Sequence, residues 1–253
     1  MLSVAIITFN EEKNIARCLE SVKNIATEII VLDSLSTDNT KQICESFGTK
    51  FIAQPFLGYI EQKNKAIEYC TQPYILSLDA DECLDEVLQK SIQQVLENNS
   101  TADAFIMNRC TSFCGHWIKH GAWYPDKKIR LLKQGMGFWG GTNPHDKIIL
   151  NKNAQLQHLK GDILHYSFYS LDEYITQSNK FTTIQSQAML LQNKKSNWFK
   201  IIVNPMVAFV NGYIFKRGFL DGWDGYFIAK TIAYFTMVKY IKLLCLQQKK
   251  TTN

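Results

Sequence analysis

The chain has 253 residues, of which 46% are hydrophobic and 20% are charged. This composition is typical of a globular protein and argues against disorder apart from the ends of the chain, and the length suits one large domain or one domain with an appendage. The net charge of +5 is unevenly placed, because residues 194–253 hold ten Lys or Arg against two Asp, whereas the rest of the chain holds 18 basic against 21 acidic side chains.

Strand and helix signals alternate over the first hundred residues. Short, apolar, β-branched runs predict strands at 3–8, 28–33, 51–53, 74–79 and from 104 onward. The segments between them predict helices that end near 22 and 47 and that cover about 59–71 and 85–97, with Asn10 as the cap of the first. Apolar strands separated by helices are typical of an α/β fold with a mostly parallel sheet covered on both faces.

Polar residues follow three of these strands directly, at 8–11, 33–34 and 79–81. The carboxyl ends of parallel strands meet at one edge of the sheet, and open α/β sheets bind their ligands beyond that edge. We therefore expect these side chains to line one binding rim.

The pattern changes between about 110 and 169, where Gly, Trp, His and Pro are dense and helical periodicity is absent. This segment is predicted to form loops and short strands, which is where a substrate is usually met. A helix over 170–192 follows, and after it a tail rich in aromatic and basic residues.

Two carboxylates one residue apart, Asp79 and Asp81, end the strand at 74–79. Such a pair can face one Mg²⁺ or Mn²⁺ and leave the other coordination positions to phosphate oxygens. An acidic turn that caps the helix near Asp85 is the alternative for an isolated pair. Asp33 ends another strand, where its carboxylate can accept a hydrogen bond from a base or a ribose, and this shared position favours a rim that binds metal and nucleotide.

Four segments in order, "VAIITFNEEKNI", "IIVLDSLSTDNT", "GYIEQKNKAI" and "YILSLDADE", resemble the inverting family 2 glycosyltransferases of the GT-A fold over roughly residues 2–100. The resemblance implies a UDP-sugar donor and a divalent metal, Mg²⁺ or Mn²⁺. It implies nucleotide contacts from Thr8, Asn10, Glu11, Asp33, Lys63 and Asp79, and metal ligation by Asp81. Lys63 stands where many members have Arg, so it keeps the charge without the planar fork.

Four later segments, "GAWYPDKKIRLLKQG", "NPHDKI", "LHYSF" and "KRGFLDGWDGY", resemble the bacterial lipopolysaccharide inner-core β-1,4-glucosyltransferases that act on heptose. The resemblance implies transfer of glucose from UDP-glucose to a lipid-anchored heptose. It also implies that residues 1–192 are the catalytic domain, with a nucleotide-binding part (1–100) and an acceptor-binding part (101–192). Residues 193–253 are then a helical extension next to the membrane.

Inversion at the anomeric carbon needs a base that removes the acceptor proton. The resemblance implies Asp146 for this role, where many relatives have the longer Glu, and His165 as a second metal ligand; a structural His at a strand end is the alternative. Lys128, Arg130 and His145 are candidates for contacts with the diphosphate or the acceptor. Two alternatives stay open. Lys128 and Arg130 lie on a solvated surface in the first, and Asp146 forms an ion pair with Lys147 or Arg130 that only holds the loop in the second.

No signal peptide and no stretch of about 18 apolar residues is apparent, so a spanning helix is not expected. Seven cysteines without a CxxC pair indicate reduced thiols. The basic, aromatic tail over 198–250 favours helices at an anionic membrane surface, with a basic appendage packed on the domain as the alternative. We therefore expect a cytoplasmic protein bound peripherally to the inner membrane, with no nucleic-acid partner.

Three alternatives compete with this interpretation. A sugar nucleotidyltransferase is disfavoured, because the loop after the first strand, 8–12, is acidic and lacks glycine. A non-catalytic module that binds nucleotide sugars has no need of Asp79, Asp81, Asp146 and His165 together. A family 2 transferase acting on a polyprenyl phosphate or another surface glycan stays open, because acceptor choice in such domains resides in loops.

Overall fold

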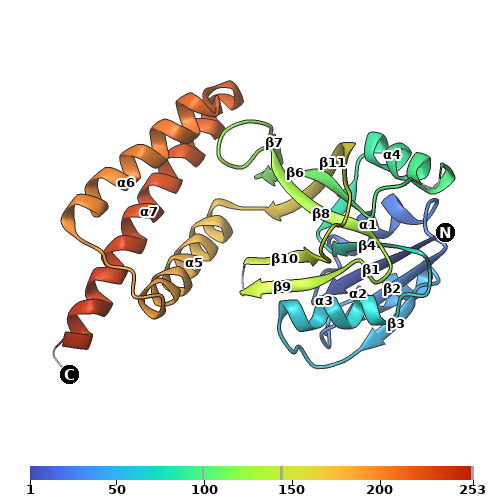
Figure 1. The fold of residues 1–253 in the computed structure, drawn as a ribbon. Coiled ribbons are helices and arrows are strands. Elements are labelled where there is room, and N and C mark those ends of the chain that lie inside the picture. The colour runs from blue at the N-terminus through green and yellow to red at the C-terminus, as the bar shows by residue number, and fades with distance from the viewer. Residues whose placement is uncertain (99, 143–144, 252–253) are drawn as a thin grey trace. The chain divides into compact units, whose positions relative to one another are not determined.

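The computed structural model describes residues 1–98, 100–142 and 145–251, without the side chains of Thr142, His145, Lys250 and Thr251 (Figure 1). The chain forms two compact units. The first comprises residues 1–109 and 126–166, and the second comprises residues 110–125 and 167–253. Each unit has its own hydrophobic core.

The first unit begins with four parallel strands in the order β3-β2-β1-β4. They are β1 (Leu2–Thr8), β2 (Glu28–Asp33), β3 (Lys50–Ala53) and β4 (Tyr74–Asp79). All four lie where the apolar runs predict strands. In register, Thr8 pairs with Asp33 and Ile7 pairs with Asp79, so the polar residues after these strands do reach one edge.

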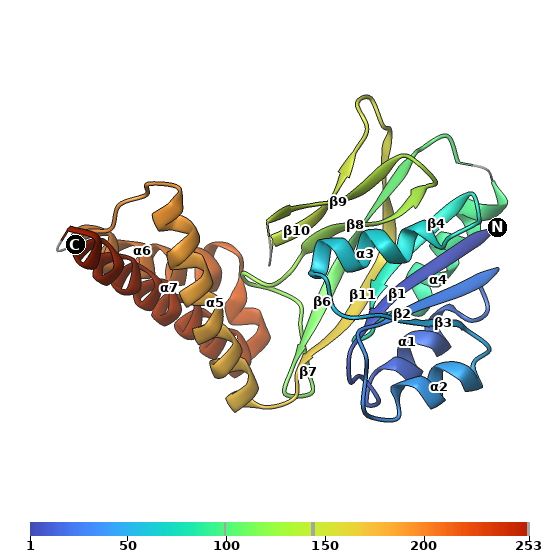
Figure 2. The same ribbon diagram turned by 90° about the horizontal axis from the view of Figure 1, so that it is seen from below.

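Helices cover both faces of this parallel sheet, as the uninterrupted apolar strands predict. They are α1 (Ile15–Val22), α2 (Thr40–Ser46), α3 (Tyr59–Glu68) and α4 (Glu86–Glu97). Val4 and Ile6 of β1 join one core with α1 and α4, whereas Ala5 between them joins a second core with α3. Figure 2 shows α3 on one side of β1 to β3, and α1 and α2 on the other.

Beyond β4 the sheet turns antiparallel. Among the described residues it contains nine strands, and the second half follows the order β4-β8-β6-β11-β5, with β7 paired to β6. These strands are β5 (Glu82–Leu84), β6 (Ala104–Phe113), β7 (His116–Ile118), β8 (Asp126–Lys133) and β11 (Leu156–Phe168). A separate hairpin pairs β9 (Gly137–Thr142) with β10 (His145–Leu150).

The prediction of loops and short strands over 110–169 therefore underestimates the sheet. β11 is 13 residues long, yet its burial does not alternate regularly, so its sequence carries no clear period of two. Its partner β5 lies some eighty residues earlier in the chain, and such non-local pairing leaves little trace in the local sequence.

Side-chain caps begin two of the predicted helices. Asp85 caps α4 by accepting from the Leu88 N–H at 2.7 Å, and Ser170 forms a capping box at the start of α5. The prediction that Asn10 caps the first helix is wrong, because α1 begins after Asn14. Asn10 instead adopts a positive φ of 53° and accepts a hydrogen bond from the Thr37 N–H at 2.8 Å.

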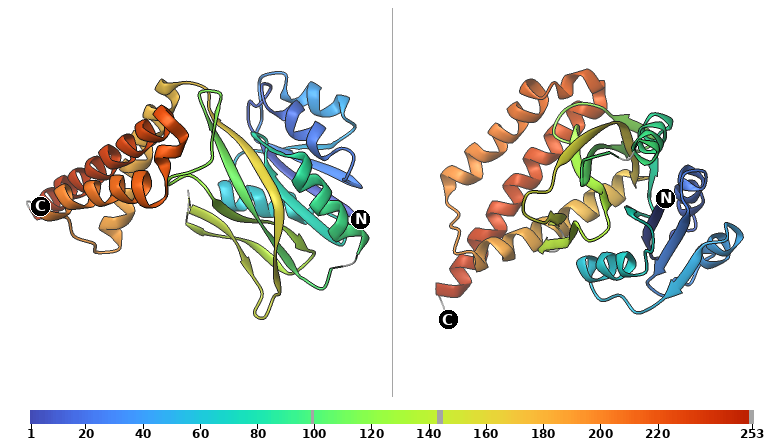
Figure 3. Two further views of the ribbon diagram at one scale, coloured as in Figure 1. Left: turned by 90° about the horizontal axis from the view of Figure 1, so that it is seen from above. Right: turned by 45° about the vertical axis from the view of Figure 1, so that its right-hand side comes forward.

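The second unit is mainly helical. It contains α5 (Leu171–Leu191), α6 (Trp198–Val210), a π-helical turn (Asn211–Phe215), a 3₁₀ turn (Gly218–Asp221) and α7 (Gly222–Thr251). Both α5 and α6 pack against α7 (Figure 3). Gly225 allows α7 to lie close to the 3₁₀ turn, because a Cβ there would lie 1.8 Å from the Gly218 carbonyl oxygen.

An aromatic core joins residues from both chain segments of this unit, including Phe113, Tyr174 and Ile228. The unit thus takes in α5 and residues 110–125, which the sequence-based division assigns to the catalytic domain. Tyr174 shows why: its ring makes an edge contact with Phe113 at 5.4 Å, and its hydroxyl hydrogen bonds with Thr231 Oγ1 of α7. A boundary drawn between consecutive segments cannot capture such a core.

Candidate functional site

The loops after β1 and β2 are joined through Ser36. The Asp33 carboxylate is buried and accepts from the Ser36 N–H at 2.8 Å, while the Ser36 hydroxyl accepts from the Asn10 N–H at 2.8 Å. The buried Thr8 hydroxyl finds no hydrogen-bond partner among the described residues. The structure therefore brings Thr8, Asn10 and Asp33 to one part of the rim, as predicted.

A cavity of about 400 Å³ opens beside Asp33. Its walls come from the β2 loop, α2 and β3, and are formed by Asp33, Leu35, Ser36, Lys41, Glu45, Phe51 and Ala53. Both apolar and polar groups line it, which suits a flat ring with hydrogen-bonding edges.

Glu11 lies on the acidic side of the same rim. Burial raises the pKa of its carboxyl group, and the negative charges of Asp81, Asp38 and Asp79 raise it further, against a hydrogen bond from Asn14 that lowers it. Carboxylates that oppose one another's ionisation mark a place where an added cation stabilises the protein.

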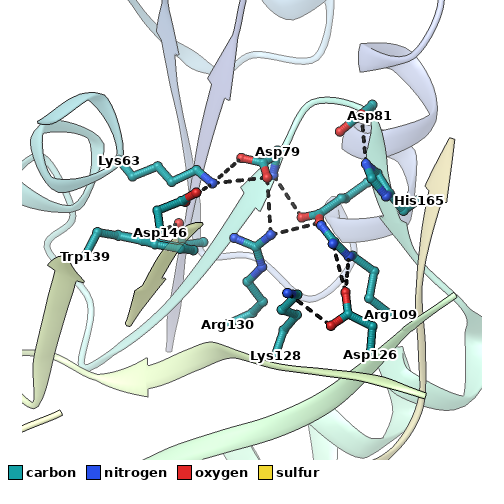
Figure 4. Close-up of polar contacts among 12 residues, drawn as sticks. Lys63, Asp79, Asp81, Arg109, Asp126, Lys128, Arg130, Trp139, Asp146 and His165 are labelled. Atoms are coloured by element: carbon teal, nitrogen blue, oxygen red, sulfur yellow. Dashed lines mark hydrogen bonds and ion pairs between the residues drawn. The ribbon is translucent and has the colours of Figure 1, made fainter. Parts of the chain in front are cut away.

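Asp79 lies between two cations. The Lys63 ammonium is 3.0 Å from its Oδ1, and Arg130 Nη2 is 3.2 Å from its Oδ2 (Figure 4). Burial alone raises the pKa of the Asp79 carboxyl, but Lys63 and Arg130 outweigh burial and hold that pKa well below its usual range. Asp79 is therefore a carboxylate fixed in its charged form.

Lys63 also connects Asp79 to Asp146. Its ammonium lies 2.8 Å from Asp146 Oδ2 and 4.3 Å from the centre of the Trp139 ring. Asp146 and Trp139 belong to the β9–β10 hairpin, whereas Lys63 belongs to α3. The next residue, Asn64, holds β9 in place by exchanging two hydrogen bonds of 2.8 Å with the Trp139 backbone.

A second branch of ion pairs runs from Asp79 through Glu82. Glu82 is fully buried and lies 2.9 Å from Arg130 Nη2 and 3.3 Å from Arg109 Nη1, and Arg109 in turn pairs with Asp126 at 2.8 Å. The Asp79 N–H also donates to Glu82 Oε2 at 3.1 Å. This series of ion pairs, in which positive and negative side chains alternate, fixes the backbone that carries Asp79.

Sequence reasoning missed Glu82, Arg109 and Trp139 as parts of this network. Glu82 did carry a signal, because it extends the acidic "DADE" run at the end of β4. Arg109 and Trp139 carried none, since only the antiparallel pairing of β6 with β8 and the docking of the hairpin on α3 bring them here.

The metal-ligand candidates Asp81 and His165 also come together. His165 Nε2 lies 3.1 Å from Asp81 Oδ2, and the antiparallel pairing of β11 with β5 sets His165 opposite Glu82. Figure 4 shows both side chains on the opposite side of Asp79 from Asp146. Within the described residues no three His, Cys, Asp or Glu side chains form a metal-binding cluster. One carboxylate and one imidazole nevertheless suit a divalent ion whose other ligands are phosphate oxygens and water.

The remaining candidates have different surroundings. Arg130 is buried over the Trp139 ring, 4.9 Å from its centre, with Nη2 engaged by Asp79 and Glu82. Lys128 is partly exposed and pairs with Asp126 at 3.1 Å. The backbone of His145 begins β10, but its side chain lies outside the described part of the chain. Asp146 pairs with Lys63 in α3, which was not among the partners considered from sequence.

Residues 3–172 match the family model described as glycosyl transferase family 2. The chain belongs to glycosyl transferase family 2. This membership confirms the transferase class and the fold inferred from the sequence motifs.

Relatives of this family 2 glycosyltransferase cover nearly its whole length. An uncharacterized glycosyltransferase of Rickettsia typhi is 31% identical over 251 residues, which is 96% of this chain and 86% of the relative. The lipopolysaccharide core biosynthesis glycosyltransferase LpsC of Rhizobium meliloti is 28% identical over 248 residues, 96% of this chain and 91% of LpsC.

Among solved structures, the mannosyltransferase PcManGT of Pyrobaculum calidifontis, determined with GDP-Man and Mn²⁺, superposes with a TM-score of 0.57. It is 13% identical, and the match covers 96% of this chain and 86% of PcManGT. This similarity confirms the GT-A fold of the present family 2 transferase, with a mixed sheet flanked by helices and a helical C-terminal part.

Proposed function

We propose that this family 2 transferase is an inverting hexosyltransferase that moves glucose from UDP-glucose to a heptose of the lipopolysaccharide inner core. The observation that carries the proposal is the ion-pair bridge through Lys63, which joins Asp146 of the hairpin to Asp79 at the end of β4. The bridge joins the carboxylate proposed for the acceptor side to a carboxylate proposed for the donor side, so donor and acceptor would meet at this network.

Asp146 is the proposed general base. A sugar hydroxyl is a poor nucleophile at neutral pH, so a carboxylate must take its proton as the new bond forms. The Asp146 side chain is 15% exposed, which leaves it accessible at the edge of a largely buried network. Lys63 orients the Asp146 carboxylate through their ion pair, and the Trp139 ring limits the freedom of Lys63.

The donor side is proposed to use the rim. Asp33 accepts hydrogen bonds from the nucleoside, in or beside the cavity at the end of β2, and Thr8, Asn10 and Glu11 complete that contact. Asp81 and His165 would hold a divalent cation, which when bound neutralises the departing diphosphate. Arg130 supports this site indirectly, because its guanidinium is buried beneath Asp79 and Glu82.

Similarity to LpsC supports a lipopolysaccharide acceptor, and the basic C-terminal segment supports work at an anionic membrane surface, on the cytoplasmic face of the inner membrane. Lys128 and His145 are proposed to contact acceptor or donor phosphates. Transfer to a polyprenyl phosphate or to another surface glycan, in place of lipopolysaccharide, is the alternative.

The test is a transfer assay with a panel of UDP- and GDP-sugars and with truncated lipopolysaccharide or polyprenyl phosphate as acceptor. We expect UDP release with UDP-glucose and lipopolysaccharide, and a β-linked product. Asp146→Asn keeps the side-chain shape, so it should leave UDP-glucose affinity nearly intact and lower transfer ~100-fold or more. Near wild-type transfer by this variant, or an α-linked product, contradicts the proposed base.

A further inference from the structure

The outer face of α6 is apolar, against the usual arrangement of a surface helix. Trp198, Phe199 and Met206 are 73%, 69% and 64% exposed, and Phe215 in the following turn is 76% exposed. Further exposed apolar side chains on α6, on the turns after it and at the start of α7 are Ile202, Val207, Val210, Ile214, Phe219, Leu220 and Trp223. We call this set the α6 apolar face.

The same helix has a defined inner side. Ile201 is buried, and α6 packs along α7, where Phe209 of α6 and Tyr213 of the π-helical turn make edge contacts with Tyr226 at 6.1 and 5.7 Å. These contacts satisfy one side of α6 within the unit. The exposed apolar side chains are therefore a second face, which the described residues do not cover.

The segment Trp198–Phe215 is long and apolar enough to cross a membrane by length and composition, with a mean hydropathy of 1.3 and 11% of it buried. The expectation from sequence that the chain has no such stretch is wrong on those two criteria, because α6 together with the π-helical turn supplies one. Crossing by this segment without α7 would break the aromatic contacts with Tyr226. An orientation in the membrane plane preserves them.

Basic side chains flank the α6 apolar face at both ends. Lys194, Lys195 and Lys200 lie around the start of α6, and Lys216 and Arg217 follow the π-helical turn. Lys200 is turned back toward the preceding loop, where its ammonium donates to the Lys195 carbonyl at 2.7 Å. Basic side chains at both ends of the face, with aromatic and aliphatic side chains between them, complement a bilayer with anionic headgroups and an apolar interior.

We propose that the α6 apolar face inserts into the interfacial region of an anionic lipid bilayer, with α6 lying in the membrane plane and its basic ends at the headgroups. The second unit thereby acts as a monotopic anchor. This inference concerns a surface outside the transfer site and does not depend on the identity of donor or acceptor.

Flotation of the full-length protein with vesicles tests the proposal without any measurement of transfer. We expect binding to vesicles of phosphatidylcholine with 30% phosphatidylglycerol, and a residual bound fraction in 1 M salt, because apolar insertion is not screened by ions. The variant Phe199→Ser/Ile202→Ser/Met206→Ser should bind these vesicles at least ~10-fold more weakly, since it removes three large apolar groups from the face.

A matched control removes three exposed apolar groups elsewhere, in the variant Val87→Ser/Ile175→Ser/Leu191→Ser. It should bind vesicles as the wild type does, within about twofold. Equal binding by the wild type and the α6 variant overturns the proposal. A lipid-free dimer that the α6 variant abolishes, without vesicle binding by the wild type, also overturns it and assigns the face to a second copy of the chain.

The depth of α6 separates insertion in the plane from crossing. A spin label on Met206→Cys, in a background with Cys114→Ser and Cys245→Ser, reports the depth of the middle of the segment. A position at the headgroup–acyl boundary, like that of a label on Phe199→Cys, supports the proposal. A position near the bilayer centre overturns it, because the middle of a crossing helix lies there.

Discussion

The buried carboxylate Glu82 offers the most direct test of the ion-pair network. Its oxygens meet Arg130 Nη2 at 2.9 Å, Arg109 Nη1 at 3.3 Å and the Asp79 N–H at 3.1 Å, and the side chain is fully buried. Glu82→Gln keeps the shape but leaves two arginines without their shared counter-ion. Removing one partner of a buried ion pair costs about 3–5 kcal/mol, and the retained amide oxygen places this variant near the lower end.

A loss of about 3 kcal/mol lowers the melting temperature by roughly 6–12 °C for a domain of 150–250 residues. Thermal unfolding followed by circular dichroism measures this shift. The control is Glu68→Gln, which removes an exposed pair with Lys65 and should shift the melting temperature by less than about 3 °C. The double variant Glu82→Gln/Arg109→Gln should be less destabilised than the sum of its single variants, because they share one contact. A melting temperature for Glu82→Gln equal to that of the wild type refutes the reasoning.

Three further predictions concern the rim and the thiols. Asp81→Ala should lower turnover at least ~100-fold, as loss of one preorganised electrostatic group does, and full activity of this variant or of the wild type in excess chelator contradicts that role. Asp33→Ala should raise the Michaelis constant for UDP-glucose with turnover kept, since its contact is equal in ground and transition states; lower turnover with unchanged UDP affinity argues otherwise. In the native protein a thiol reagent should modify Cys114 and Cys245 quickly, because both are exposed, and the other five cysteines only after denaturation. Burial raises the pKa of Cys44 and Cys70 to about 12, so rapid modification of a third thiol would show that the core opens.

The sequence by itself determined the parallel half of the sheet and the residues at its edge. β2 and β4 begin and end where the apolar runs do, because a strand covered on both faces must be apolar throughout. Parallel strands in a common register then bring Thr8, Asp33 and Asp79 to one edge without further information. The helix after Ser170 was equally accessible, since its capping box is a local signal.

Prediction from local sequence was wrong where a residue or strand contacts a partner far away in the chain. Asn10 resembles a helix cap, but the β2 loop supplies a better partner in the Thr37 N–H, and α1 starts four residues later than the cap would place it. The antiparallel strands β6, β8 and β11 pair with segments far away in the chain, so their residues need not alternate by themselves.

Only the tertiary structure decided how the charged residues combine. Lys63, Asp146 and Trp139 come from a helix and a hairpin whose contact depends on Asn64, and Glu82 is buried only because two arginines from β6 and β8 neutralise it. The outward direction of the α6 apolar face likewise follows from packing on α7, since the composition of the segment is the same whichever side it buries. Both the pairing of charges and the direction in which a helix face points depend on distances between residues remote in sequence, and these distances exist only in the folded chain.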